Sequence, residues 1–174
     1  NEDVLPAGEA GKGYLALTPY PGGAGFDIHK RIKQHILDKG KSDLKDPKSF
    51  GSVYYNSGLI NAAIAVEAIR AGQKKFGNRP LNGEEGRWGL EHLNIDDARL
   101  KDIGFGGLMQ KLKLSCSDHE GGGAARVQQW DGAKWNLVTD WIQADRKLLR
   151  PLIDAKSAAY AKEKAVTPRD CSKA

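Results

Sequence analysis

The chain has 174 residues, of which 40% are hydrophobic and 28% are charged, and its formal net charge is +5. This balance is typical of a globular protein with one sizeable core, and it argues against disorder. No run approaches the roughly 18 consecutive apolar residues of a transmembrane helix. The basic groups around Lys30, Lys74 and Lys147 have acidic residues close by in sequence, which favours solvated helix faces over a nucleic-acid partner.

The beginning of the chain is unusual for a complete protein. Its single methionine is Met109, so it lacks an initiator Met, and it carries no recognisable signal peptide. We therefore expect either that a leader has been removed or that the chain is part of a longer protein.

One strand and several helices are predicted in the first two-thirds. The apolar run 13–18 ends at Pro19 and predicts a buried strand that leads into a loop. Gly40 is a suitable helix C-cap and Ser52 a suitable N-cap. Helical periodicity then predicts helices over 26–39, over 53–76, from Pro80 onward and over 96–103. In the helix that starts at Pro80, we expect Trp88, Leu90 and Leu93 to be buried.

The last third changes to strand alternation and then returns to a helix. Strands are predicted over 113–115, 124–130 and 134–139, with a tight hairpin at Asp131-Gly132. A helix over 145–164 is interrupted by Pro151, which predicts a kink or a break. The helix is expected to turn these residues toward the core: Leu148, Leu149, Leu152, Ile153 and Tyr160.

This order predicts an α/β chain, but a single strand before the helices is too few to complete a parallel sheet. The incomplete sheet is a second reason to expect a fragment.

Three adjacent polar residues, Asp118, His119 and Glu120, form the strongest candidate for catalysis. They suggest a hydrolase site, with or without a metal ion. Neighbouring residues on a strand point to opposite faces, however, so a polar turn before a hairpin explains them better. The sequence also lacks GxGxxG, GxxxxGK[ST], GxSxG and HExxH motifs. We therefore expect no enzyme activity, no metal site and no cofactor.

The aromatic residues suggest binding. Tyr20 follows the first predicted strand, and Tyr54 and Tyr55 open the longest helix. Tyrosine offers an apolar ring and a hydroxyl, which suits the wall of a small-molecule pocket. Ordinary core packing explains these residues equally well.

Trp130 and Trp135 flank the predicted hairpin turn. Cross-strand packing of the two rings is the favoured interpretation. The alternative is an exposed face that binds carbohydrate or a protein partner.

The two cysteines, Cys116 and Cys171, lie 55 residues apart without zinc-ligand spacing. They are either one disulfide or two free thiols, and the composition leaves both possibilities open.

Five segments together resemble one protein family. They are YLALTPY at 14–20, VYYNSG at 53–58, SCSDHEGGG at 115–123, VQQWDG at 127–132 and TPRDC at 167–171. Their order and spacing resemble the branched-chain amino-acid type of periplasmic substrate-binding protein of ABC transporters. The resemblance extends over nearly the whole chain.

The resemblance implies the C-terminal portion of a two-lobed type I periplasmic-binding-protein fold, with helices on a mainly parallel sheet and a C-terminal β-hairpin and helix. Such a protein captures an amino acid or small carboxylate between its lobes, and an aromatic-rich wall favours an aromatic solute. It delivers this solute to a membrane permease and its ATPase. The family is periplasmic, so the resemblance favours a Cys116–Cys171 disulfide.

By analogy, residues 1–18 would end the C-terminal lobe and 19–23 would form a hinge crossover. Residues 24–113 would form part of the N-terminal lobe. Residues 114–174 would supply the return crossover, the hairpin and the final helix of the C-terminal lobe. The missing N-terminal part would be a partner without which the chain is not stable, unless it forms a swapped oligomer.

The resemblance also implies a binding role for the three tyrosines. Tyr55 is the best candidate for an aromatic wall of the pocket, followed by Tyr54 and then Tyr20 at the crossover. Their roles would be apolar contact and hydrogen bonding.

Overall fold

The computed structural model describes residues 4–173. Its helices and strands, in chain order, are η1 (Leu5–Gly11), β1 (Leu15–Thr18), α1 (Asp27–His35), η2 (Leu37–Lys39), η3 (Pro47–Ser49), α2 (Val53–Phe76), α3 (Gly83–Glu91), β2 (Asn94–Ile95), α4 (Asp97–Ile103), β3 (Leu112–Lys113), β4 (Ala124–Trp130), β5 (Trp135–Leu137), β6 (Ile142–Gln143), α5 (Arg146–Glu163) and η4 (Cys171–Lys173).

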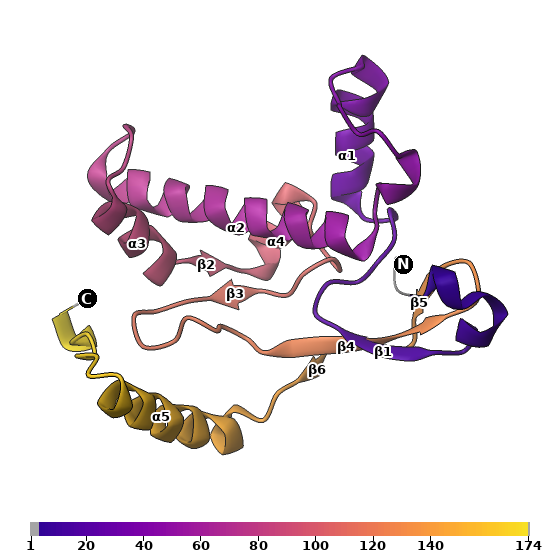
Figure 1. Cartoon of the computed structure of the whole chain (residues 1–174). Coiled ribbons are helices and arrows are strands. Elements are labelled where there is room, and N and C mark those ends of the chain that lie inside the picture. Colours follow the sequence, from indigo (N-terminus) through magenta and orange to yellow (C-terminus); the bar gives the residue numbers. More distant parts are fainter. Residues whose placement is uncertain (1–3, 174) are drawn as a thin grey trace.

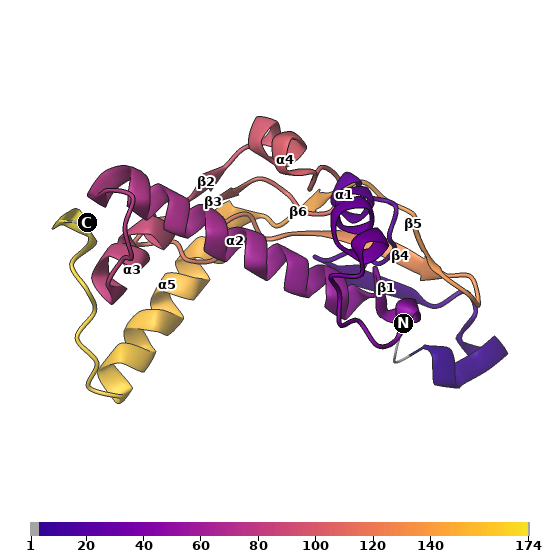
Figure 2. The same ribbon diagram turned by 90° about the horizontal axis from the view of Figure 1, so that it is seen from above.

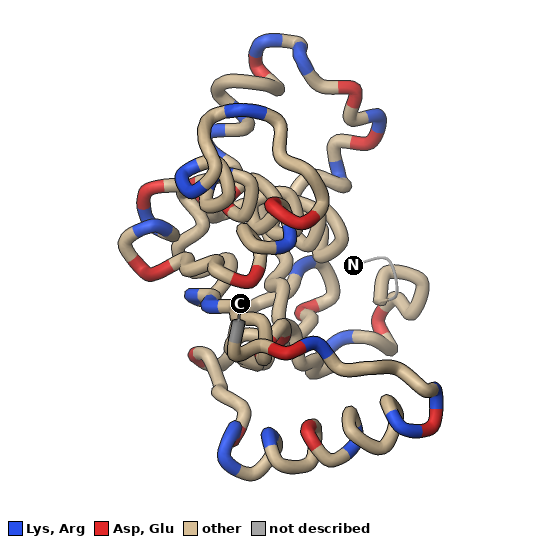
Figure 3. Tube along the Cα trace, turned by 90° about the vertical axis from the view of Figure 1, so that its left-hand side faces the viewer, with Lys and Arg blue, Asp and Glu red and all other residues tan. Residues whose placement is uncertain are grey.

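Two regions are visible in the ribbon. The long helix α2 runs above the short β2–β3 pair together with α3 and α4, while β1, β4 and β5 form a separate sheet (Figure 1). Helix α5 extends away from both regions, as the view from above also shows (Figure 2). Basic and acidic residues are interspersed along the chain, as expected for solvated helix faces (Figure 3).

The larger sheet is built around β4. Strand β1 pairs with β4 antiparallel, with Leu15 opposite Gln129 and Thr18 opposite Arg126. Strands β5 and β6 also pair with β4 antiparallel. The α/β fold class is confirmed, but every pair of named strands among residues 4–173 is antiparallel. The mainly parallel sheet expected of the complete fold is therefore not formed by these strands. Strands β1 and β4, which are separated in sequence by the helical region, are neighbours in the sheet but run in opposite directions.

The helical region contains the main hydrophobic core. Helix α2 packs closely on α3, where a Cβ on Gly89 would lie 2.2 Å from the carbonyl oxygen of Ala68, so only glycine permits this approach. The buried core residues are Ile60, Leu93, Ile95, Leu100, Phe105, Leu108 and Met109.

The predicted limits of the longest helix are confirmed. The hydroxyl of Ser52 accepts the backbone N–H of Tyr55 at 3.2 Å, and Gly77 follows the last turn. The prediction for the next helix is partly wrong: Leu93 is buried, but Leu90 is exposed. Because α3 ends at Glu91, helical spacing no longer relates these two leucines.

The predicted burial of the first strand is wrong for its outer face. Leu15 and Leu17 are exposed, Leu17 by 71%, whereas Thr18 is buried. Alternation places Leu15 and Leu17 on one face of the sheet, and that face has no cover from the rest of the described chain.

The final helix differs from prediction in two ways. It continues from Arg146 to Glu163 through Pro151, so the predicted break is absent. Its apolar side chains also fail to reach the core: α5 has no buried residue, and Leu148 is 65% exposed. The exposed or half-exposed residues are the five predicted to be internal, namely Leu148, Leu149, Leu152, Ile153 and Tyr160.

Candidate functional site

A buried asparagine ties the start of α2 to the segment that follows β1. Asn56 is fully buried, and its side-chain N–H groups donate to the carbonyl oxygens of Pro21 at 2.8 Å and Gly23 at 3.0 Å. Backbone carbonyls in a loop otherwise lack partners, so this amide fixes the path of the chain between β1 and α1.

The remaining atom of the Asn56 amide determines the state of a buried histidine. Its Oδ1 lies 2.7 Å from Nε2 of His29 on α1 and can only accept, so Nε2 carries the proton. Burial lowers the pKa of His29, opposed by this hydrogen bond. His29 is therefore neutral at pH 7, and its Nδ1 is a buried acceptor without a protein partner among the described residues.

Tyr55 joins this group through its ring. The ring lies 5.2 Å from Phe50 in an edge-to-face arrangement and 6.2 Å from His29. Burial raises the pKa of its hydroxyl above the ordinary value. Aromatic contacts of this kind give a rigid wall with one polar tip.

The three predicted tyrosines are in different environments. Tyr20 is half-buried against the core and adjoins Pro21, which Asn56 holds. Tyr54 is 65% exposed, because it lies about 100° around the helix from Tyr55. Tyr20 and Tyr55 are thus next in sequence to Pro21 and Asn56, which the hydrogen bonds join, whereas Tyr54 is exposed to solvent. Residues 4–173 form five clefts on other parts of the surface, and none of these is lined by the three tyrosines.

Sequence reasoning missed both His29 and Asn56. A signal did exist for Asn56, since it lies four residues before Ile60 on the buried stripe of α2 and is polar. The pairing with His29 is 27 residues distant in sequence, and no local pattern predicts it.

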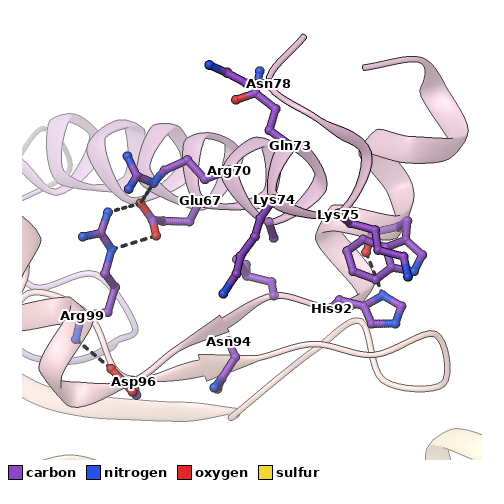
Figure 4. A pocket seen from close by; sticks show the side chains of 13 residues that line it. Glu67, Arg70, Gln73, Lys74, Lys75, Asn78, His92, Asn94, Asp96 and Arg99 are labelled. Atoms are coloured by element: carbon purple, nitrogen blue, oxygen red, sulfur yellow. Dashed lines mark hydrogen bonds and ion pairs between the residues drawn. The ribbon is translucent and has the colours of Figure 1, made fainter. Parts of the chain in front are cut away.

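A cleft of about 930 Å³ lies elsewhere in the helical region. It is open to solvent and is bordered by the C-terminal half of α2, the end of α3, β2 and the start of α4 (Figure 4). We call it the Lys74 cleft. The lining residues are Glu67, Arg70, Ala71, Gln73, Lys74, Lys75, Asn78, Trp88, His92, Leu93, Asn94, Asp96 and Arg99.

The Asp118–Glu120 segment has a structural role in place of a catalytic arrangement. Asp118 forms ion pairs with Arg146 and Arg150, which attach the start of α5. His119 is exposed, and its Nε2 lies 3.4 Å from the Glu91 carboxylate. Among the described residues no group of three potential metal ligands meets. The hydrolase interpretation gains no support.

The two hairpin tryptophans pack against each other. Trp130 is 1% exposed, and its ring meets Trp135 edge-to-face at 5.4 Å. An exposed binding face would need both rings in solvent, so the carbohydrate or partner-binding module also gains no support.

The C-terminal segment is fastened to the helical region. Cys116 and Cys171 form a disulfide with Cα atoms 5.6 Å apart. Nearby, Arg169 holds the buried Glu91 carboxylate with two hydrogen bonds of 2.5 and 2.6 Å. The hydrogen bond from Arg169 keeps the pKa of Glu91 below its ordinary value.

No helix of residues 4–173 combines the length and the apolar character needed to cross a membrane. The chain matches no protein-family model and no curated protein.

Two solved structures are similar. One is a crystal structure described as an ABC transporter permease from the Pseudomonas fluorescens group, with 78% identity and a TM-score of 0.95. The other is described as a branched-chain amino acid ABC transporter from Thermus thermophilus with bound valine, with 24% identity and a TM-score of 0.60. The likeness covers 98% and 82% of this chain but only 41% and 37% of those chains. This chain is therefore related to ABC transporter proteins, and its α/β fold is that of part of a type I periplasmic binding protein.

Proposed function

We propose that the chain supplies part of the solute-binding component of an ABC importer, with no enzymatic step. The observation that carries this proposal is the likeness over 98% of the chain to an ABC transporter protein. The fold likeness to a protein with bound valine supports an amino acid or small carboxylate as the solute.

The strand pairing supports a hinge. Thr18, where the chain leaves the sheet, is opposite Arg126, close to the point where it returns at Ala124. Both connections to the helical region thus leave the sheet at the same end. Two adjacent crossovers allow one rigid body to rotate against another around a ligand.

The proposed lobes follow from these crossovers. Residues 19–23 and the return from 114 onward are the hinge, 24–113 belong to one lobe, and 1–18 with the hairpin and α5 belong to the other. The Asn56 hydrogen bonds would hold the first crossover in position at the start of α2.

Tyr55 and Tyr20 would line the solute site beside this hinge, and exposed Tyr54 would complete its rim. Closure would exclude water and strengthen each polar contact to the solute. A permease and its ATPase would receive the solute. A periplasmic location agrees with the Cys116–Cys171 disulfide, since disulfides persist in oxidising compartments.

A further part of the protein would cover the apolar side chains that this chain exposes. These lie on β1, on the outer side of α2 and on α5: Leu15, Leu17, Val66, Ile69, Leu148 and Leu152. The chain spans 41% of the 78%-identical structure, which is consistent with such a part.

Calorimetric titration of the complete protein with valine, phenylalanine and small organic carboxylates tests the proposal. At least one of them should bind saturably. Tyr55→Phe should then weaken binding by about three- to ten-fold, the effect of one lost hydrogen bond. Tyr160→Phe on α5 is the matched control and should leave affinity unchanged. Equal loss in both variants, or no binding of any of these solutes, would contradict the proposal.

A further inference from the structure

The Lys74 cleft contains more positive than negative charge. Its lining includes four cationic side chains, Arg70, Lys74, Lys75 and Arg99, against the carboxylates of Glu67 and Asp96. Such an excess inside a concave wall attracts anions, provided that the carboxylates do not already neutralise the lysines.

Both carboxylates interact with groups other than the two lysines. Glu67 accepts two hydrogen bonds from Arg99, at 2.7 and 2.9 Å, and its pKa is lowered chiefly by them. Arg70 lies 3.6 Å from the same carboxylate. Asp96 accepts the backbone N–H of Arg99 at 2.7 Å and so caps α4. The negative charges thus compensate the two arginines and the helix end, and they leave the lysines unneutralised.

The two lysines occupy different parts of the cleft. In Figure 4, Lys74 projects from α2 toward β2, between the Glu67–Arg99 pair and His92. It makes no ion pair within residues 4–173. The Lys75 ammonium lies 5.8 Å from the centre of the Trp88 ring and forms no ion pair with any other described residue.

The remaining walls suit a small organic molecule. The rings of Trp88 and His92 stack with their centres 3.9 Å apart, and Nδ1 of His92 donates to the Trp88 carbonyl at 2.9 Å. Asn78 and Asn94 are also among the residues at the edge of the cleft. A volume of about 930 Å³ is within the range of small-molecule sites.

We propose that the Lys74 cleft binds a small organic oligoanion, a molecule with at least two carboxylate or phosphate groups, between Lys74 and Lys75. The cleft has walls on α2, α3, β2 and α4, which favours a small molecule over a flat protein surface. This site is separate from the proposed solute site, because it is not lined by Tyr20, Tyr54 or Tyr55. The proposal can therefore be tested independently of the proposed function.

Titrations with citrate and with inorganic pyrophosphate test the proposal on the complete protein. Either anion should bind saturably with Kd near 1 mM or lower, and more weakly as salt is added. The indole N–H signal of Trp88, assigned with a Trp88→Phe variant, should shift during the titration. Tighter binding of citrate would assign carboxylates to the ligand, and tighter binding of pyrophosphate would assign phosphates.

The double variant Lys74→Gln/Lys75→Gln should raise Kd about ten-fold, and Lys74→Gln alone about three-fold. Lys156→Gln on α5 removes the same charge outside the cleft and should change Kd by less than about two-fold. The single variant replaces an exposed side chain, so it tests the site even if the double variant unfolds. Absence of saturation at about 10 mM, or an equal loss in Lys156→Gln, would overturn the proposal.

Discussion

The helical region and the final helix α5 both carry apolar residues at helical spacing, but only the helical region buries them. In the helical region, α2, α4 and the segment around Leu108 enclose a common core. On α5 the apolar side chains remain exposed, and the helix is attached through its ends, by the Asp118 ion pairs and by the disulfide near the C-terminus. Periodicity therefore predicts which side of a helix is apolar, whereas burial depends on what lies opposite.

The largest expected effect concerns the covalent attachment of the C-terminal segment. A Cys116→Ser/Cys171→Ser variant should lose about 4 kcal/mol of stability on a chain-entropy estimate for a loop of 55 residues. Hydrogen exchange should accelerate in α5 far more than in α2, because α5 has no buried residues. Unchanged exchange in α5 would show that it is held by contacts other than its ends.

The next effect compares two leucines directly. Leu108→Ala removes a fully buried side chain and should cost about 3 kcal/mol in the free energy of unfolding, measured by urea denaturation of the complete protein. Leu148→Ala on α5 should cost clearly less, because residues 4–173 leave this side chain 65% exposed. Equal costs would mean that Leu148 is packed as fully as Leu108 in the complete protein.

A third test concerns the buried amide at the proposed hinge. Asn56→Ala leaves the carbonyls of Pro21 and Gly23 without their buried partner and should cost about 2 kcal/mol. Asn61→Ala, at an exposed position of the same helix, is the control and should cost almost nothing. If thermal unfolding of the two variants were indistinguishable, the amide would not hold the crossover.

The smallest effect is a dependence on pH. The pKa of His29 is lowered in the folded state by burial, so the unfolded chain takes up a proton first as the pH falls. Stability should therefore decrease as the pH falls below 6.5, the ordinary pKa, and should level off below the folded pKa. His29→Gln should reduce this slope, while His35→Gln on the exposed side of α1 should retain it. A slope that persists in His29→Gln would assign it to another group.

The sequence predicted the elements better than their surroundings. The limits of α2, its Ser52 cap and strand β4 follow from local patterns, and all three are confirmed. The exposed faces of β1 and α5 were not predictable, because periodicity carries no information about the opposing surface. The His29–Asn56 pair and the ion pair between Arg169 and Glu91 were missed for a related reason: each joins residues far apart in sequence.

The most direct test of the central claim is a distance measurement across the proposed hinge. Spin labels at Lys134→Cys on the hairpin and Lys101→Cys on α4 report the separation of the two regions in the complete protein, while the native cysteines remain paired. Addition of a saturating solute identified by calorimetry should shorten the mean distance and narrow its distribution. A bound solute that leaves the distribution unchanged would contradict capture between two closing lobes.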